Sequence, residues 1–245
     1  MLGPQDNPQF PPLLQGVRVK GAIDPVAKGC ALAELGCDAG TVVYNLAADR
    51  MSTAIVLAPE VSLEDSMAAL PVCGLGLQNA LGALAPPEVS VHLGWTGGIF
   101  VNGARCGRFR SDCSDRDPDA VPSWLVIGFE LQVIPVDAES PGLDPNRTSL
   151  FEEGCVNVSP TDLVESWARH TLVWINRWTE EGTVAVHREW KGIARGLGEE
   201  ITVGWRGRSL EGIFLGVDER FGMLLRQRRD TQLLPLSGLL ASDRN

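Results

Sequence analysis

In the first part of the chain, short hydrophobic runs typical of strands and runs with helical spacing follow one another. Short apolar runs bounded by glycine or polar residues are typical of strands. Such runs lie at residues 17–21, 41–44 and 52–57, with a helical run at residues 27–35. Residues 62–65 then resemble a helix-capping box, and leucines recur at helical spacing up to Pro86-Pro87, with Pro71 and two glycines expected to kink or interrupt that helix.

The central part of the chain predicts a meander of strands and one long helix. Asn102-Gly103 is the residue pair that best accommodates positive φ angles, so it predicts a tight hairpin. Ser159 and Pro160 provide the N-cap and first position of a helix that Gly182 can end. Strands are expected at residues 89–93, 99–101, 105–109 and 123–133, and a mobile loop at residues 111–122.

The last part of the chain changes to short strands separated by glycines, which predicts a small β-barrel or SH3-like unit. These strands are expected at residues 201–206, 210–217, 221–225 and 233–236. The fold class is therefore α+β, with a mixed or antiparallel sheet packed by helices and a small β domain after it. We expect an extended, proline-rich arm over residues 1–16, the main domain over 17–195 and the small domain over 196–240.

Composition narrows the function classes. The formal net charge of −10 argues against nucleic-acid binding, which needs clustered lysines and arginines. The first residues lack the basic start and apolar run of a signal peptide and the chain has no long charge-free apolar stretch, so we expect a cytoplasmic protein without membrane partners. The six cysteines form no Cys-x-x-Cys pair, so we expect reduced thiols and no metal site.

Several motifs in series resemble those of the biotin/lipoate protein ligase family. Residues 91–107 resemble the family's Lys-Trp-Pro-Asn-Asp stretch with its hairpin and following Lys, and residues 125–133 resemble its apolar-Ile-Gly-x-Gly-Ile-Asn strand. Residues 180–182, followed by Trp190, are similar to the family's helix end. Residues 212–225 resemble the Gly-x-x-x-Gly-Ile-Asp-x-x-Gly-x-Leu-Leu signature of the ligase C-terminal domain. The resemblance implies the ligase fold over about residues 17–240.

The resemblance also implies an activity, in which biotin or lipoate is joined to AMP and then passed to a lysine of a carrier protein. Such chemistry needs cations and a backbone-rich loop around the carboxylate and triphosphate. Here residues 45–51 replace the family's glycine- and arginine-rich loop, and Pro25-Val26-Ala27 replaces its Ser-Thr-Asn. Gly94 matches the family's Lys and Gly97-Gly98 its Asn-Asp, so handling of ATP and magnesium is expected only if ligase activity survives.

These departures favour a divergent member that binds a small carboxylic acid or acyl ligand without efficient adenylation. Glu130 and Gln132 replace a family Gly and Asn, and this added carboxylate disfavours an anionic ligand nearby. The fold would place Lys20 beside the pocket. The expected ligand-binding residues are Trp95, Gly97, Gly98, Arg105, Gly128 and Tyr44.

Two alternatives remain open. The chain can be an active, divergent ligase that uses ATP and a carrier-protein lysine. It can also be an ATP-independent acyltransferase with Cys155 as nucleophile, although Glu152 and Glu153 would raise a thiol pKa there and no Lys replaces Arg105. The candidate catalytic residues are Arg105 and Cys155. The family also permits a homodimer formed through edge strands.

Overall fold

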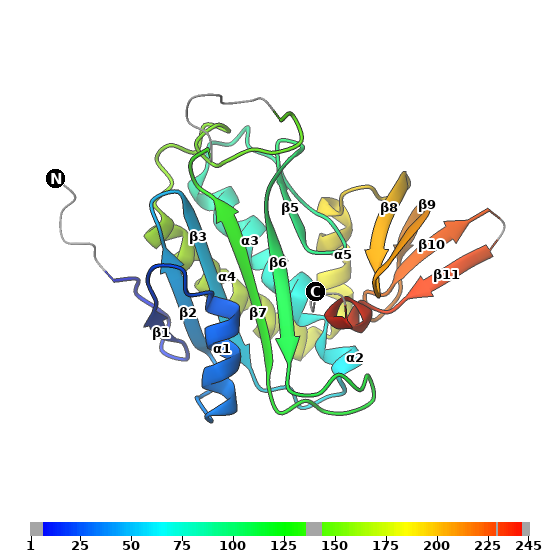
Figure 1. The fold of residues 1–245 in the computed structure, drawn as a ribbon, viewed down its shortest axis with the longest axis horizontal. Helices are drawn as coiled ribbons and strands as arrows, with labels where there is room; N and C mark the ends of the chain where they lie inside the picture. The colour runs from blue at the N-terminus through cyan, green and yellow to red at the C-terminus, as the bar shows by residue number, and fades with distance from the viewer. Residues whose placement is uncertain (1–6, 136–143, 229, 242–245) are drawn as a thin grey trace.

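The computed structural model describes residues 7–135, 144–228 and 230–241. It contains a seven-stranded sheet and a four-stranded sheet (Figure 1). The larger sheet has the order β1-β2-β3-β7-β6-β5-β4, with β1 parallel to β2 and the other neighbours antiparallel. Its strands are β1 (Gln15–Arg18), β2 (Thr41–Leu46), β3 (Arg50–Leu57), β4 (Val91–Leu93), β5 (Gly98–Val101), β6 (Ala104–Cys113) and β7 (Leu125–Gln132).

Helices cover the two faces of this sheet unequally. Helices α3 (Ala69–Leu84) and α4 (Pro160–Glu181) pack behind it and bury the main core, whereas α1 (Pro25–Glu34) lies in front (Figure 1). Alternate strand residues face alternate sides, so Phe109 and Phe129 join the main core while Arg110 and Gly128 face the α1 side. We call this second side the α1 face. The mixed sheet packed by helices confirms the predicted fold class.

Local signals account for most element boundaries. Asn102 and Gly103 have φ angles of 47° and 92°, which confirms the predicted hairpin. Ser159 caps α4, and Gly182 ends it with a φ of 72°. The predicted kink lies elsewhere: the helical stretch breaks between α2 (Leu63–Ser66) and α3, and Pro71 falls in the first turn of α3, where proline removes no helical hydrogen bond. Helix α2–α3 is apolar enough to cross a membrane, but the stretch is 72% buried and serves as a core element.

Two connecting segments are more ordered than the sequence suggested. In the predicted loop at residues 111–122, β6 continues to Cys113, and the carbonyls of Pro118 and Ala120 accept hydrogen bonds from the first turn of α2. Of the expected N-terminal arm, residues 1–6 lie outside the described residues. Phe10 contacts the ring of Tyr44, with centroids 5.8 Å apart, and β1 begins at Gln15. The arm therefore packs on the sheet edge from Phe10 onward.

The four C-terminal strands form an open antiparallel sheet of order β11-β10-β9-β8. The predicted small β domain is present, but within the described residues its edge strands do not pair, so the expected SH3-like barrel is not closed. The apolar face of this sheet packs against a helix instead of closing on itself, because Phe214 and Phe221 contact Trp190 of α5 (Thr183–Ile193). The sequence did not predict this helix. The elements are β8 (Glu200–Trp205), β9 (Arg208–Val217), β10 (Met223–Gln227), β11 (Asp230–Leu234) and the 3-10 helix η1 (Leu236–Ala241).

Candidate functional site

The α1 face carries a row of polar side chains at the level where the family motifs meet. The sheet register aligns Asn45, Ser52, Glu130, Arg108 and Gly98 across five neighbouring strands. The Asn45 amide donates to the carbonyls of Gly21 and Ile23, which fixes the chain leading into α1.

Carboxylates pair with the arginines in the centre of this face. Arg108 Nε lies 2.9 Å from Glu130, and Arg50 approaches the other oxygen of Glu130 at 3.9 Å. Arg110 lies 2.5 Å from Asp24, the N-cap of α1. These pairs are partly exposed and contribute little to stability, but they satisfy the positive charges locally. Arg50, Arg108 and Arg110 are therefore not free for a triphosphate.

The connection between β2 and β3 is too short to hold phosphates. Only residues 47–49 join the strands, and the amide of Ala47 donates to the carbonyl of Arg50 to close a tight turn. A phosphate-cradling loop needs several free backbone amides in a concave arrangement. The described residues also hold no cluster of three His, Cys, Asp or Glu side chains suited to a metal ion. The turn at residues 47–49 does not fit a triphosphate as the family's loop would.

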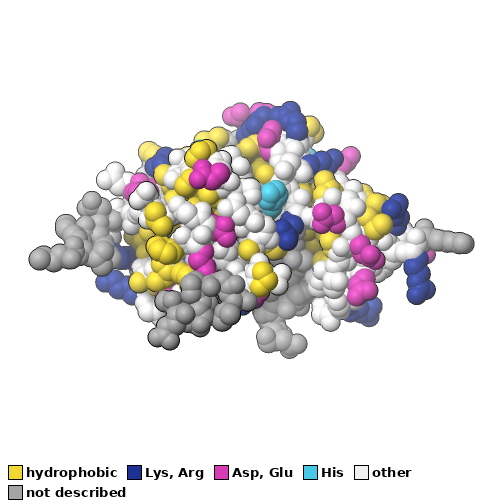
Figure 2. Space-filling view, turned by 90° about the horizontal axis from the view of Figure 1, so that it is seen from above, with side chains coloured by type: hydrophobic (Ala, Val, Ile, Leu, Met, Phe, Trp, Pro, Cys, Tyr) yellow, Lys and Arg dark blue, Asp and Glu magenta, His cyan; other side chains and the backbone are white. Residues whose placement is uncertain are grey.

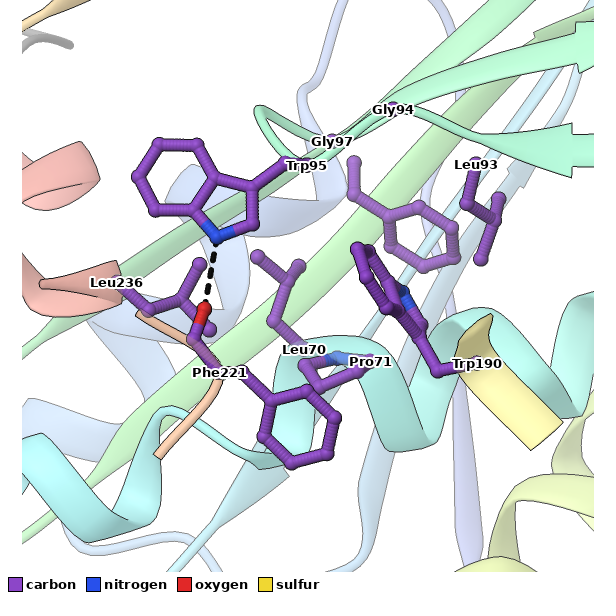
Figure 3. Close-up of a pocket in the computed structure, with 10 residues that line it drawn as sticks. Leu70, Pro71, Leu93, Gly94, Trp95, Gly97, Trp190, Phe221 and Leu236 are labelled. Carbon is purple, nitrogen blue, oxygen red and sulfur yellow. Dashed lines mark hydrogen bonds between the residues drawn. The ribbon is translucent and has the colours of Figure 1, made fainter. Parts of the chain in front are cut away.

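The Trp95 side chain lies between the two sheets and links them. Its side chain is 4% exposed, and the indole nitrogen donates to the carbonyl of Phe221 over 2.7 Å (Figure 3). Gly97, Leu70 and Trp190 line the same small apolar cavity, whose volume of about 20 Å³ has room for roughly one water molecule. A ligand of acyl size does not fit there, so the geometry gives Trp95 and Gly97 a structural role.

The other two predicted glycines adjoin large side chains. A Cβ at Gly128 would lie 2.6 Å from both the Thr53 carbonyl and Val26, so this glycine lets α1 pack on the sheet. A Cβ at Gly98 would lie 2.8 Å from the ring of Phe100 on the α1 face. Gly128 is thus covered by α1, whereas Gly98 lies directly beneath the Phe100 ring.

Tyr44 and Lys20 lie away from the centre of the α1 face. Tyr44 is buried in the main core on the opposite face, and burial raises the pKa of its hydroxyl. Lys20 is exposed beyond the end of β1. The structure therefore does not bring these two side chains together with Gly98 or Arg105.

Arg105 lies exposed at a bulge where β6 meets β5. It pairs with Phe100 on β5, and on its other side its backbone exchanges hydrogen bonds with Asn146 and Thr148. The bulge shifts the strand alternation, so Arg105 shares the α1 face with Phe100 instead of the core face with Phe109. This local shift places the exposed Arg105 on the α1 face.

Cys155 is 3% exposed in the main core, near Leu150 and Cys106. Burial, followed by the carboxylates of Glu153 and Glu88, raises the pKa of its thiol. A nucleophilic cysteine needs the opposite surroundings, with exposure and neighbouring positive charge. This environment does not favour the predicted catalytic role.

The sequence did not single out Phe100 and Arg195, which the structure brings together. The Arg195 guanidinium lies 4.3 Å from the centre of the Phe100 ring. The two residues are far apart in the sequence, and no motif links them. Only the register of the Asn102-Gly103 hairpin could have placed Phe100 on the same face as Arg105.

Comparisons with known proteins agree with this architecture. A 53% identical structure with a TM-score of 0.88 is a biotin protein ligase-like protein of unknown function from Silicibacter sp. TM1040, and covers 96% of this chain and 99% of that one. Biotin protein ligase from Aquifex aeolicus is 16% identical with a TM-score of 0.74, over 94% and 97% of the two chains. A biotin–[acetyl-CoA-carboxylase] ligase of Paracoccus denitrificans is 26% identical over 67% of this chain and 68% of its own length.

Two family models match the chain in separate stretches. Residues 197–242 match a domain of unknown function, DUF4444. Residues 10–192 match the biotin/lipoate A/B protein ligase family, which spans the large sheet, its helices and the hairpin. The chain therefore belongs to the biotin/lipoate A/B protein ligase family.

Proposed function

We propose that this protein binds a small carboxylic acid or acyl ligand on the α1 face without efficiently adenylating it. The observation that carries the proposal is the tight turn at residues 47–49, which stands where an adenylating enzyme needs a phosphate-holding loop. The pairing of Arg108 and Arg110 with carboxylates supports it, because those cations are then unavailable to stabilise developing charge on a triphosphate. Seen from above, the upper side of the molecule likewise carries acidic side chains interspersed with basic ones (Figure 2).

Thermal unfolding with and without ligands tests this function. We expect biotin, lipoate or octanoate to raise the melting temperature, because a ligand that binds only the folded state stabilises it. ATP with magnesium should leave the melting temperature unchanged, alone or with the acid. Stabilisation by ATP alone would contradict the proposal.

An active ligase is the second candidate, and the curated Paracoccus relative, named as a biotin–[acetyl-CoA-carboxylase] ligase, favours it. Under this alternative the substrate is biotin and the partner a carrier-protein lysine. Pyrophosphate exchange with biotin, lipoate and octanoate separates the candidates, because acid-dependent formation of labelled ATP requires adenylation. The buried, electronegative surroundings of Cys155 disfavour the ATP-independent acyltransferase. The cytoplasmic location and the homodimer remain predictions.

A further inference from the structure

Phe100 fills the space that side chains would occupy at two motif positions. Its ring would lie 3.3 Å from a Cβ at Gly94 and 2.8 Å from a Cβ at Gly98. These are the positions where the related ligases carry a Lys and an Asp. The ring therefore covers Gly94 and Gly98 on the α1 face. Phe100 belongs to β5, a part of the sheet that α1 does not cover (Figure 1).

A cation is held over this ring by a different segment. The Arg195 guanidinium lies 4.3 Å from the centre of the Phe100 ring, within cation–π range. Its backbone is fixed as well, because the Arg195 amide donates to the Leu93 carbonyl and Ala194 bridges to Leu93 at the edge of β4. The linker between α5 and β8 thus brings a positive charge next to Gly94, where the motif itself has none.

Two further arginines share the level of Phe100. Arg105 pairs with Phe100 across β5 and β6, and Arg147 pairs with Arg105 by a parallel bridge. Paired residues of neighbouring strands point to the same side of a sheet. We name Phe100, Arg105, Arg147 and Arg195 the Phe100 shelf.

The charge of the shelf is unbalanced, unlike that of its surroundings. All three arginines are exposed, and none forms an ion pair within the described part of the chain. On the same face, Arg108 and Arg110 are both paired with carboxylates. In a chain of net charge −10, the Arg195 guanidinium over the ring and two further unpaired arginines on the adjoining strands form a local site for an anion.

We propose that the Phe100 shelf binds the carboxylate group of the ligand, with Arg195 and Arg105 as its direct contacts and Phe100 under its apolar part. This inference rests on the proposed function and names the group of the ligand that is recognised. A planar guanidinium can donate two hydrogen bonds to one carboxylate, which suits an acid better than a single ammonium does. Arg195 thereby supplies the cation that Gly94 lacks.

Calorimetric titration with matched acid and amide pairs tests the shelf. The probes are octanoate, lipoate and biotin, each beside its primary amide, which has the same shape without the charge. We expect each acid that binds to bind at least about tenfold more tightly than its amide, since hydrogen bonds between charged groups are about twice as strong as neutral ones. Arg195→Met and Arg105→Met should each weaken acid binding about tenfold and leave amide binding unchanged.

Two control variants keep the test interpretable. Arg195→Lys should restore part of the acid affinity, and Arg226→Met, an exposed arginine on β10, should bind like the wild type. All these side chains are exposed, so unliganded melting temperatures should match. If an acid binds wild type, Arg195→Met and Arg105→Met equally, or no more tightly than its amide, the shelf is overturned and the proposed function stands. If no acid binds the wild type, both are overturned.

Discussion

The Trp95 indole links the hairpin motif to the C-terminal sheet through one buried hydrogen bond to Phe221. We expect Trp95→Phe to lower the free energy of unfolding by about 1–3 kcal/mol, because the Phe221 carbonyl loses its donor in a buried place. Chemical denaturation measures this. Trp178→Phe is the control, since the Trp178 side chain is only partly buried and its indole makes no hydrogen bond within the described residues.

Acid binding gives the second readout for the same variant. If Trp95 has only a structural role and does not contact the ligand, Trp95→Phe retains the wild-type affinity for the acid once the folded fraction is accounted for. A loss of affinity in fully folded Trp95→Phe would instead return Trp95 to the ligand site.

The thiol of Cys155 should resist alkylation. Because burial and nearby carboxylates raise its pKa, little thiolate exists at neutral pH. We expect iodoacetamide to modify Cys155 at least about tenfold more slowly in the folded protein than in denaturant, where all six cysteines are accessible. Peptide mass spectrometry over time measures the rates. Rapid modification of folded protein would revive the acyltransferase interpretation.

Single residues show where sequence reasoning about the site stopped. The motif match singled out Arg105 as a ligand contact, which stays a prediction. The structure places Arg105 as an exposed residue beside the hairpin, whose turn is set by local φ angles. It could not show that the Trp95 indole points between the sheets, since its hydrogen-bond partner lies in another domain of the sequence. Arg195 carried no signal at all, because its position depends on a bridge to Leu93.

The contact between α3 and α4 depends on a glycine. A Cβ at Gly76 would lie 2.2 Å from the Thr171 hydroxyl and 3.0 Å from its Cα, so Gly76→Ala must push the helices apart. We expect it to lower the free energy of unfolding by about 1–3 kcal/mol. Gly82→Ala in the same helix meets nothing within 4 Å and should raise that free energy by about 0.5–1 kcal/mol. Equal effects in urea denaturation would contradict the close contact.

Elements with local signals were predictable and those fixed by distant contacts were not. The capped helix α4 and the Asn102-Gly103 hairpin follow from their own residues. Helix α5 has no side-chain cap, and its Trp190 is buried between the C-terminal sheet and distant residues of α3 and β4. The same packing explains the open sheet, because its apolar face already has a partner and needs no closure into a barrel.

At the scale of the whole molecule, the C-terminal sheet and η1 are fixed to helices α2 and α5 by several contacts besides the Trp95 hydrogen bond. Ser237 donates to Glu64 of α2, and Arg220 lies 2.9 Å from Asp65. His187 Nε2 lies 2.5 Å from the Asp218 carbonyl, and its ring lies 4.4 Å from that of Phe221. Because Arg195 belongs to the linker between these parts, their docking also positions the Phe100 shelf.

Docking should therefore depend on pH through His187. Burial lowers the pKa of His187 below its ordinary value of 6.5, so the unfolded chain takes up this proton at a higher pH than the folded protein does. The stabilisation is complete above about pH 6.5 and is lost as the pH falls through the folded-state pKa. We expect urea denaturation to show a lower free energy of unfolding at about pH 5.5 than at about pH 7.5, and a smaller difference in His187→Gln. Some pH dependence should remain in the variant, because burial also lowers the pKa of His170. An unchanged difference between the two pH values in His187→Gln would show that this imidazole is not the group that titrates.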